Sequence, residues 1–429
     1  MQASLNGEFP VKENAGPDAD YIRLRWPVRA LNRIGRSLAT AGLTPSVDGD
    51  AILRRARRRH GHPTVLMQET IEGLRVRARS YDRDAGLSLF GRLIVRRDLE
   101  RCIANQLAFE RAWDEEPAIR EQRIERPLFV VGLPRSGTTL MQRLLCCHDG
   151  ARYIPFWEAH EPVPRQLRRS AKDTASRAAA GARAVRQLNY VAPALSKQVH
   201  PITDESDPEE CYHLFLYSQL LPPGFDFARL TSYWDWFEAL PDRALPYRMF
   251  KRQLMALQWV RAGEHLLLKS PTHMSRMPEL LEVFPDARIV YMERDAAQSV
   301  ASLASLVAQL WSLISDEVDL DEVGKFVLET SAYSKEFAER GLRDLPADQV
   351  QRVAFEDFMR DPVGCASGVY SRLGYQAPEG LAAKMQAFMA ENPREKHGKH
   401  SYRLADFGLD GLVVRERLAT AAALGAGIL

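Results

Sequence analysis

The sequence lacks the features of a membrane-spanning, secreted or strongly charged protein. No uninterrupted apolar run approaches the roughly 20 residues that cross a bilayer, and the N-terminus has no basic stretch followed by an apolar one. The 58 basic and 56 acidic side chains leave a formal net charge of +2, too small to predict a strong attraction to nucleic acid or to a membrane. We therefore expect a cytoplasmic protein with no transmembrane segment and no nucleic-acid partner.

Cysteine is also scarce. The five cysteines have neither the spacing of a metal site nor an even number that would form a disulfide framework: Cys102, Cys146, Cys147, Cys211 and Cys365. Free thiols in a reducing compartment are the simplest interpretation, and no metal is expected.

One local departure from the charge balance is a run of arginines within residues 54–59, which follows a plausible helix start at Asp48 and Asp50. Such a run is typical either of a patch for nucleic acid or acidic membrane, or of a solvated helix face. Because the total charge is balanced, we favour the solvated helix face.

At 429 residues the chain is long enough to bury a large core, and 45% hydrophobic with 27% charged residues is the composition of a globular protein. Polar residues 1–20 predict a loose tail. Helical patterns follow over 21–120. We expect an α/β domain over 121–405 and a separate C-terminal segment over 406–429.

Four short apolar runs predict buried strands, each followed by a helical pattern: 128–131, 265–269, 287–293 and 350–355. Strands that alternate with helices in this way form parallel β–α–β units. The predicted fold class is α/β, with a central parallel sheet flanked by helices and an added N-terminal helical region. In such sheets, ligands bind at the carboxyl ends of the strands.

The first of these strands leads through a glycine-bounded loop into a helix, within residues 127–142. A turn of this kind surrounds an anion with loop N–H groups and the positive end of the helix. The spacing from Gly132 to Gly137 is that of a P-loop, yet Thr138 stands where a P-loop has lysine, and the basic residue lies inside the loop at Arg135. The missing lysine argues against an ATPase, because no other residue replaces its reach to the β- and γ-phosphates.

Two further strand ends carry groups that bind anions. Lys269-Ser-Pro-Thr-His273 closes the strand at 265–269. Arg294 follows the strand at 287–293, and Ser302 comes eight residues later on the next helix. Three strand ends with such groups indicate one anion-binding edge of the sheet.

These stretches resemble the sulfotransferase family, whose members take a sulfuryl group from 3′-phosphoadenosine 5′-phosphosulfate. Residues 134–139 resemble the family's 5′-phosphosulfate loop, and Arg294 with Ser302 resembles its 3′-phosphate motif. Residues 269–273 lie where members place a Lys and often a His, and 394–400 resemble the late basic loop that closes over the nucleotide. The resemblance covers roughly residues 125–405.

Three other features resemble a largely bacterial branch of the family: the N-terminal helical region, the pair Trp157-Glu158, and Tyr402 followed by Asp406-Phe-Gly408. The resemblance implies a P-loop-like fold and a metal-free, in-line transfer that releases adenosine 3′,5′-bisphosphate. The donor-binding residues that it implies are Arg135, Ser136, Gly137, Thr138, Thr139, Leu140, Arg294, Ser302, Arg394, Lys396 and Gly398.

Catalysis is expected from Lys269 and one general base, which contributes typically ~10²–10⁴-fold to the rate. Lys269 would stabilise charge on the bridging oxygen as the sulfur–oxygen bond breaks. His273 is the first choice as base because imidazole is basic near neutral pH. Glu158 is the rival, because the protein-tyrosine branch of the family uses a glutamate that follows the loop.

The acceptor is expected to be a small molecule, a lipid or a carbohydrate with a hydroxyl group. The aromatic segment 217–247 predicts an acceptor pocket, a lid or part of the core. The acidic run 204–210 predicts a helix start, with Asp207 as N-cap and with Glu209 and Glu210 in the first turn.

Two other function classes stay open at this point. One is an ATP-dependent phosphotransferase with a P-loop-like cradle, which would need Mg²⁺. The other is a catalytically silent nucleotide-binding protein that keeps the cradle and has no base.

Overall fold

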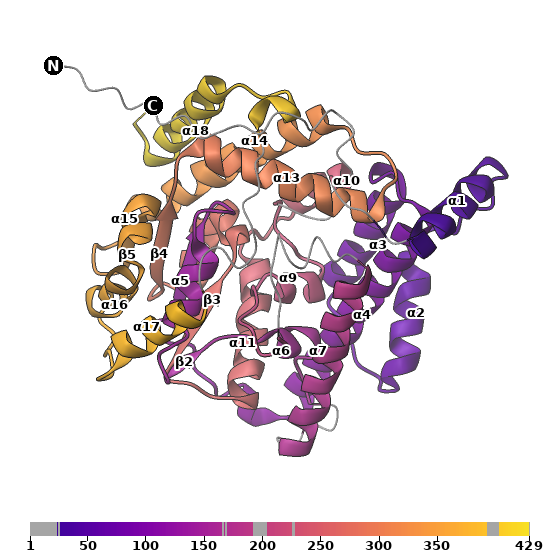
Figure 1. Cartoon of the computed structure of the whole chain (residues 1–429). Coiled ribbons are helices and arrows are strands. Elements are labelled where there is room, and N and C mark those ends of the chain that lie inside the picture. The colour runs from indigo at the N-terminus through magenta and orange to yellow at the C-terminus, as the bar shows by residue number, and fades with distance from the viewer. Residues whose placement is uncertain are drawn as a thin grey trace.

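A five-stranded parallel sheet runs through the middle of the molecule (Figure 1). The computed structural model describes residues 24, 26–164, 167, 170–191, 204–224, 228–392 and 403–428. The strands are β1 (Leu128–Gly132), β2 (Ala151–Arg152), β3 (His265–Lys269), β4 (Arg288–Glu293) and β5 (Val350–Ala354), in the order β2-β3-β1-β4-β5. Four of them match the predicted strands, which confirms the α/β class. The two-residue β2 is too short to show a period in the sequence.

Helices pack on both faces of this sheet. Before β3 they are α1 (Trp26–Thr40), α2 (Gly49–His60), α3 (Gln68–Asp84), α4 (Leu89–Glu115), η1 (Pro117–Ile119), α5 (Thr138–Leu145), α6 (Phe156–His160), α7 (Ala171–Val191), α9 (His213–Ser218), α10 (Thr231–Glu238) and α11 (Leu245–Val260). After β3 they are η2 (Pro271–Arg276), α12 (Met277–Val283), α13 (Ala296–Ile314), α14 (Leu320–Leu342), α15 (Phe355–Arg360), α16 (Pro362–Arg372), α17 (Leu381–Glu391), η3 (Leu404–Phe407) and α18 (Gly411–Ala426).

Alternate residues of β1 face two different hydrophobic cores, as the two-residue period of a strand requires. Phe129 and Val131 pack in a large core with residues of α4, α9, α11, α13 and α14. Leu128 and Val130 pack on the other face, with α5, α16 and α17. All five residues of β1 are buried, which explains the continuous apolar run in the sequence.

The central place of β1 brings three strand ends to one edge of the sheet. Leu128 pairs in parallel with Leu267 of β3 on one side and with Arg288 of β4 on the other. The residues that follow β1, β3 and β4 therefore emerge at the same edge.

The N-terminal helices share a second core with later parts of the chain. Residues of α2, α3 and α4 pack around buried Tyr233 and Phe237 of α10. The longest of them, α4, also packs against α9 and α13. The helices before β1 are thus joined to the α/β body through α10 and α13.

Among the described helices, α13 alone is long and apolar enough to cross a membrane by length and composition, with a mean hydropathy of 1.3. In the structure, 78% of that stretch is buried. It packs against α14, α18 and α4. Its apolar composition is therefore that of a core helix.

The aromatic segment 217–247 contributes mainly to the core. Tyr217, Tyr233 and Tyr247 are fully buried. Phe225 and Phe227 lie outside the described residues. Of the three predicted roles, the core is the one that the described tyrosines take.

Candidate active site

β1 ends in a loop whose backbone suits glycine at two positions. Gly132 has a φ of +154°, and a Cβ atom there would lie 2.7 Å from the carbonyl oxygen of Met292 in β4. Gly137 has a φ of +89° and is the N-cap residue of α5. Only glycine adopts such backbone angles without steric cost. The two glycines therefore allow the sharp turn from strand to helix.

The N-terminus of α5 offers hydrogen-bond donors to an anion. No side chain caps it in the part of the chain that the structure describes, so the N–H groups of its first turn, from Thr138 onward, lack helical acceptors. The hydroxyl of Ser136 is buried and has no hydrogen-bond partner among the described residues. Donors that converge without an acceptor fit a phosphate or phosphosulfate group.

Arg135 reaches from this loop to α13. Its Nε donates a 3.1 Å hydrogen bond to Oγ of Ser302, 167 residues further along the chain. Its carbonyl oxygen accepts a 2.7 Å hydrogen bond from Nη1 of Arg294. Arg135 has a φ of +72°, a backbone conformation that residues other than glycine rarely adopt. The fold thus brings two guanidinium groups and a hydroxyl together beside the loop, a combination suited to a second phosphate.

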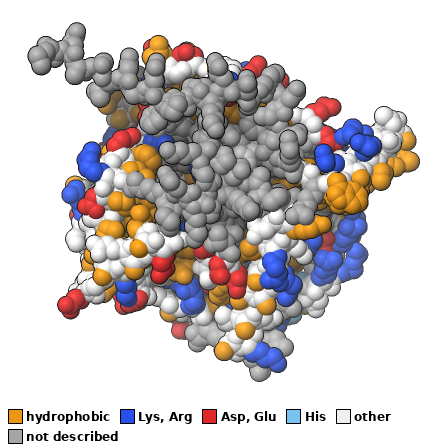
Figure 2. Space-filling view, viewed as in Figure 1, with side chains coloured by type: hydrophobic (Ala, Val, Ile, Leu, Met, Phe, Trp, Pro, Cys, Tyr) orange, Lys and Arg blue, Asp and Glu red, His pale blue; other side chains and the backbone are white. Residues whose placement is uncertain are grey.

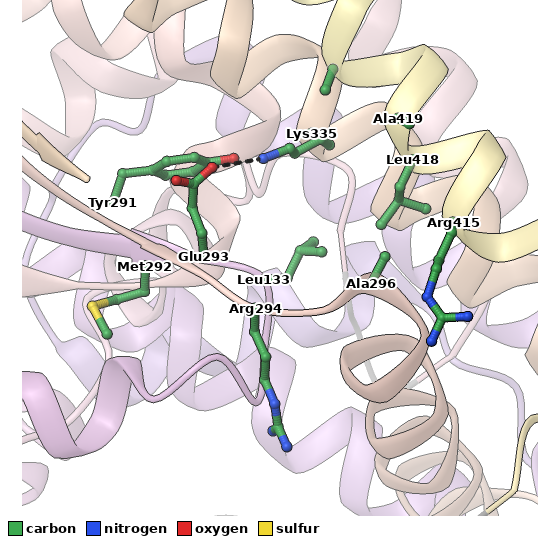
Figure 3. A pocket seen from close by; sticks show the side chains of 11 residues that line it. Leu133, Tyr291, Met292, Glu293, Arg294, Ala296, Lys335, Arg415, Leu418 and Ala419 are labelled. Carbon is green, nitrogen blue, oxygen red and sulfur yellow. Dashed lines mark hydrogen bonds and ion pairs between the residues drawn. The ribbon is translucent and has the colours of Figure 1, made fainter. Parts of the chain in front are cut away.

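Arg294 also lines a cavity of about 290 Å³ (Figure 3). The cavity is lined by Leu133, Tyr291, Met292, Glu293, Arg294, Ala296, Lys335, Arg415, Leu418, Ala419 and Ala422. Nη2 of Arg294 donates to Gln298 at 3.1 Å, and Cζ lies 4.2 Å from the ring centre of Phe355. These contacts hold the guanidinium on the loop side, away from the apolar lining of the cavity.

Lys269, the last residue of β3, forms an ion pair with Glu210. The Nζ–Oε1 distance is 2.6 Å, and Oγ of Ser270 donates to the other carboxylate oxygen at 3.4 Å. The side chain of Lys269 is 1% exposed, whereas that of Glu210 is 18% exposed. A carboxylate that is held in place and partly open to solvent can accept a proton from a bound hydroxyl group.

The segment that carries Glu210 is irregular, so the predicted helix start at Asp207 is wrong. The helix α9 begins only at His213. Before it, the carbonyl oxygen of Glu209 accepts from Nε2 of Gln142 in α5 at 3.2 Å, and the N–H of Cys211 donates to the carbonyl oxygen of Lys269 at 3.1 Å. These bonds to α5 and β3 occupy backbone groups that a helix would use, and they place Glu210 at the carboxyl end of β3.

His273, the first choice as base, lies in the aromatic core with no exposed surface. Its Nδ1 is 2.9 Å from the hydroxyl of Tyr247, and its Nε2 is 3.0 Å from Sγ of Cys211. Burial lowers the pKa of His273 to about 3, so the ring is neutral at pH 7. Both ring nitrogens thus have partners within the protein. This geometry suits a residue that holds the side chain of Cys211, the neighbour of Glu210 in the chain.

Glu158, the rival base, is also fully buried. On α6, its carboxylate accepts hydrogen bonds from both terminal nitrogens of Arg152, and a nitrogen of Arg261 lies 3.5 Å away. Two guanidinium groups therefore contact the carboxylate and balance its charge. The arrangement is that of an internal ion pair.

Three predicted donor residues, Arg394, Lys396 and Gly398, lie outside the described residues, as does Tyr402. The described members of the set meet around the loop and the end of β4: Arg135, Ser136, Gly137, Thr138, Thr139, Leu140, Arg294 and Ser302.

One group of described side chains has the composition of a metal site, at the amino end of β3 and thus at the edge opposite the loop. The ligand atoms of His148, Glu264 and His265 lie within 4.8 Å of one another. However, Nδ1 of His148 accepts from the N–H of Gly150, and its Nε2 donates to the carbonyl oxygen of Gln376, both at 2.9 Å. His148 would have to give up one of these bonds to bind an ion.

The contact of Glu210 with Lys269 is the feature that sequence reasoning missed. The local pattern of Glu210, an acid after Asp207-Pro208, is that of a helix start and carries no sign of a distant partner. One signal was available, because a lysine at the end of a buried strand needs a paired carboxylate. This argument predicts that some acidic side chain lies near Lys269, but it does not identify the residue.

Comparison with known proteins identifies the family of this chain. The sulfotransferase family model matches residues 127–379. The omega-hydroxy-beta-dihydromenaquinone-9 sulfotransferase Stf3 of Mycobacterium bovis and of Mycobacterium tuberculosis is 23% identical over 292 residues, which cover 65% of this chain and 70% of Stf3.

Two solved structures share the fold. Sulfotransferase STF9 from Mycobacterium avium superposes with a TM-score of 0.76 at 24% identity, over 87% of this chain and 95% of STF9. Sulfotransferase STF1 from Mycobacterium tuberculosis H37Rv gives 0.72 at 24% identity, over 88% of this chain and 99% of STF1. The family match extends over more than half of the chain and includes the loop and the ends of β3 and β4. The chain therefore belongs to the sulfotransferase family of transferase enzymes.

Proposed function

We propose that the chain transfers a sulfuryl group from 3′-phosphoadenosine 5′-phosphosulfate to the hydroxyl group of an acceptor. The observation that carries this proposal is the contact of Arg135 with both Ser302 and Arg294. The donor has anionic groups at its 5′ and 3′ ends and therefore needs two neighbouring anion sites. The loop supplies the first and these three residues supply the second. ATP has no 3′-phosphate for the second site to bind.

The loop holds the 5′-phosphosulfate through N–H groups of Gly137 to Leu140 and through the hydroxyls of Thr138 and Thr139. The positive end of α5 favours the negative charge there. Arg135 adds a fixed cation. A sulfuryl group carries less charge than a phosphoryl group, so these donors can stabilise the transfer with no bridging metal.

We assign the general base to Glu210. Its carboxylate takes the proton of the acceptor hydroxyl as the acceptor oxygen bonds to sulfur. The bond between sulfur and the bridging oxygen breaks, and its electron pair stays on the 5′-phosphate of the leaving adenosine 3′,5′-bisphosphate. Lys269 stabilises the charge that develops on that oxygen.

The ion pair between Lys269 and Glu210 couples these two events. While Glu210 is ionised, it holds the ammonium group at 2.6 Å. Once it has accepted the proton, the carboxyl group is neutral and the electrostatic attraction falls away. The ammonium group is then free to turn to the leaving oxygen. His273 and Glu158 serve the structure in this scheme, because each is buried and fully bonded.

A hydroxyl acceptor is supported by the relative Stf3, whose name describes an omega-hydroxy substrate. The five cysteines are free, which supports the expected reducing, cytoplasmic location. The mycobacterial relatives support a bacterial source.

Thermal unfolding with adenosine 3′,5′-bisphosphate, and separately with ATP and Mg²⁺, tests the donor. A ligand at 100 times its dissociation constant adds about 2.7 kcal/mol to the free energy of unfolding. We expect a rise in melting temperature with the bisphosphate alone. A rise with ATP and Mg²⁺ only would favour the phosphotransferase. Binding of the bisphosphate without cleavage of the donor, with or without acceptors, would favour a silent nucleotide-binding protein.

A further inference from the structure

The outer faces of α1 and α2 combine arginine side chains with exposed apolar ones. We propose that this α1–α2 surface, made of residues 26–60, docks on an anionic lipid membrane. The inference is independent of the proposed function, since it concerns neither the loop nor the strand ends.

One face of α1 is fixed to the body of the protein. Asn32 is buried, its Oδ1 accepts from the N–H of Phe90 at 3.0 Å, and its Nδ2 donates to Asp316 at 2.8 Å. The opposite face carries Trp26 and Ile34, which are 73% and 58% exposed. The helix stands out from the rest of the molecule (Figure 1). The exposed apolar side chains of α1 thus lie on a helix that projects from the molecule and is fixed to it through Asn32.

The charge of this surface differs from that of the whole chain. Residues 26–60 contain eight arginines and two aspartates, a formal charge of +6, against +2 for all 429 residues. Both aspartates are already bonded: Asp48 caps α2, and Asp50 accepts from Nε of Arg75 at 2.9 Å. These bonds go to the α2 backbone and to Arg75, so neither aspartate neutralises an arginine of this surface.

Most of these arginines face solvent. Arg36 and Arg59 pair with Asp316 and Glu100. The other six form no ion pair with any residue that the structure describes: Arg29, Arg33, Arg54, Arg55, Arg57 and Arg58. A solvated helix face would account for α2 alone, but it does not account for the exposed tryptophan and isoleucine beside it.

The basic and apolar parts lie on one side of the molecule. Both α1 and α2 pack on α4. Figure 2 shows hydrophobic side chains over α1 and basic side chains along α2 at the same side. Leu43, in the link between the two helices, is 66% exposed. The surface is therefore continuous across both helices.

This combination selects lipid over nucleic acid. Phosphate groups of either would attract the arginines. Trp26, Ile34 and Leu43 gain nothing from a sugar-phosphate backbone, whereas they can enter the boundary between lipid head groups and acyl chains. A basic amphipathic helix with tryptophan at its edge is typical of a membrane-surface element. A membrane with anionic lipids offers partners to both parts of the surface.

Co-sedimentation of the full chain with vesicles tests the proposal. The probes are vesicles of phosphatidylcholine alone and vesicles that also contain phosphatidylglycerol. We expect binding to the second kind, weakened by salt. The triple change Arg54→Gln, Arg55→Gln and Arg58→Gln should lower the affinity about fivefold for each arginine that reaches the lipid surface. The pair Trp26→Ser and Ile34→Ser should lower it as well.

The matched control removes three exposed arginines elsewhere, by Arg123→Gln, Arg360→Gln and Arg372→Gln. This variant has the same net charge as the α2 triple variant and should keep full vesicle binding. Equal loss in both variants, or no binding to anionic vesicles, would overturn the proposal. Binding of a single-stranded oligonucleotide without vesicle binding would overturn it in favour of nucleic acid. An unchanged melting temperature shows that each variant is folded.

Discussion

Arg152 holds Glu158 by two hydrogen bonds of 2.8 Å, one from each terminal nitrogen, and neither side chain is exposed. Nη2 of Arg152 also donates to the carbonyl oxygen of Leu257 at 2.9 Å. The pair therefore ties β2 and α6 to α11. A carboxylate in this position stabilises the fold. Its replacement should therefore lower the free energy of unfolding, and any loss of activity should follow from that.

We predict that Glu158→Gln lowers the free energy of unfolding by about 3–5 kcal/mol, because it leaves the Arg152 charge buried and unpaired. Urea unfolding measures this loss. Asp357→Asn is the control, since it breaks the exposed pair with Arg360 and should cost at most about 1 kcal/mol. A Glu158→Gln protein of normal stability with a strongly lowered kcat would restore Glu158 as the base.

Glu210→Gln should lower kcat by roughly 10²–10⁴-fold, the range for loss of a general base. The affinity for adenosine 3′,5′-bisphosphate should stay unchanged, because the carboxylate of Glu210 bonds to Lys269 and Ser270, which lie outside the donor loop. Steady-state kinetics with calorimetric binding separates the two effects. Asp204→Asn, on the same segment but exposed, is the control and should retain activity. Loss of binding in step with kcat would contradict the assignment.

The sequence predicted those parts of the site that are set by short spacing. Gly132, Arg135 and Gly137 lie within one loop, and eight residues join Arg294 to Ser302 across a strand end and a helix turn. A parallel sheet then brings both to one edge, so their proximity follows from the fold class. The observed bond between Arg135 and Ser302 is a consequence of that topology.

The proposed base could not be predicted in the same way. Whether a histidine or a glutamate is available depends on what packs around it, and local sequence does not show that. His273 was the first choice because imidazole is basic near neutral pH, yet Tyr247 and Cys211 from other elements bond to both of its ring nitrogens. Glu210 lies 59 residues from Lys269, so only the folded chain shows the pair.

Buried histidines should make stability depend on pH. Burial lowers the pKa of His273 to about 3, below the value of 6.5 for an exposed ring. Below pH 6.5 the unfolded chain binds a proton that the folded chain does not, so the free energy of unfolding falls as the pH falls. For His273 alone the loss at pH 5 is about 2 kcal/mol. Urea unfolding at several pH values between 4 and 7 measures this dependence. The free energy of unfolding should change less steeply with pH in His273→Gln than in the wild type. Equal slopes would contradict the buried, neutral ring.

Arg294→Ala should weaken the binding of adenosine 3′,5′-bisphosphate about 10–100-fold, as expected for a charged hydrogen bond of 1.5–3 kcal/mol. Binding of adenosine 5′-monophosphate should change little, because it has no 3′-phosphate. Calorimetry with both nucleotides measures the ratio. Arg415→Ala is the control, since Arg415 pairs with Asp295 across the cavity from Arg294. Equal weakening of both nucleotides by Arg294→Ala would place the 3′-phosphate elsewhere.

Gly132→Ala should both destabilise the protein and abolish the stabilisation by adenosine 3′,5′-bisphosphate. Its φ of +154° and the Met292 carbonyl oxygen, 2.7 Å from the added Cβ, force the loop to move. Residues held at such angles cost about 1–3 kcal/mol. Gly368→Ala is the matched control, because Gly368 lies inside α16 with open space around the added atom and should stabilise by up to about 1 kcal/mol. Thermal unfolding with and without the bisphosphate measures both effects. If Gly132→Ala kept its full response to the bisphosphate, the turn out of β1 would not be what positions the donor, and the anion site would have to rest on Arg135, Arg294 and Ser302 alone.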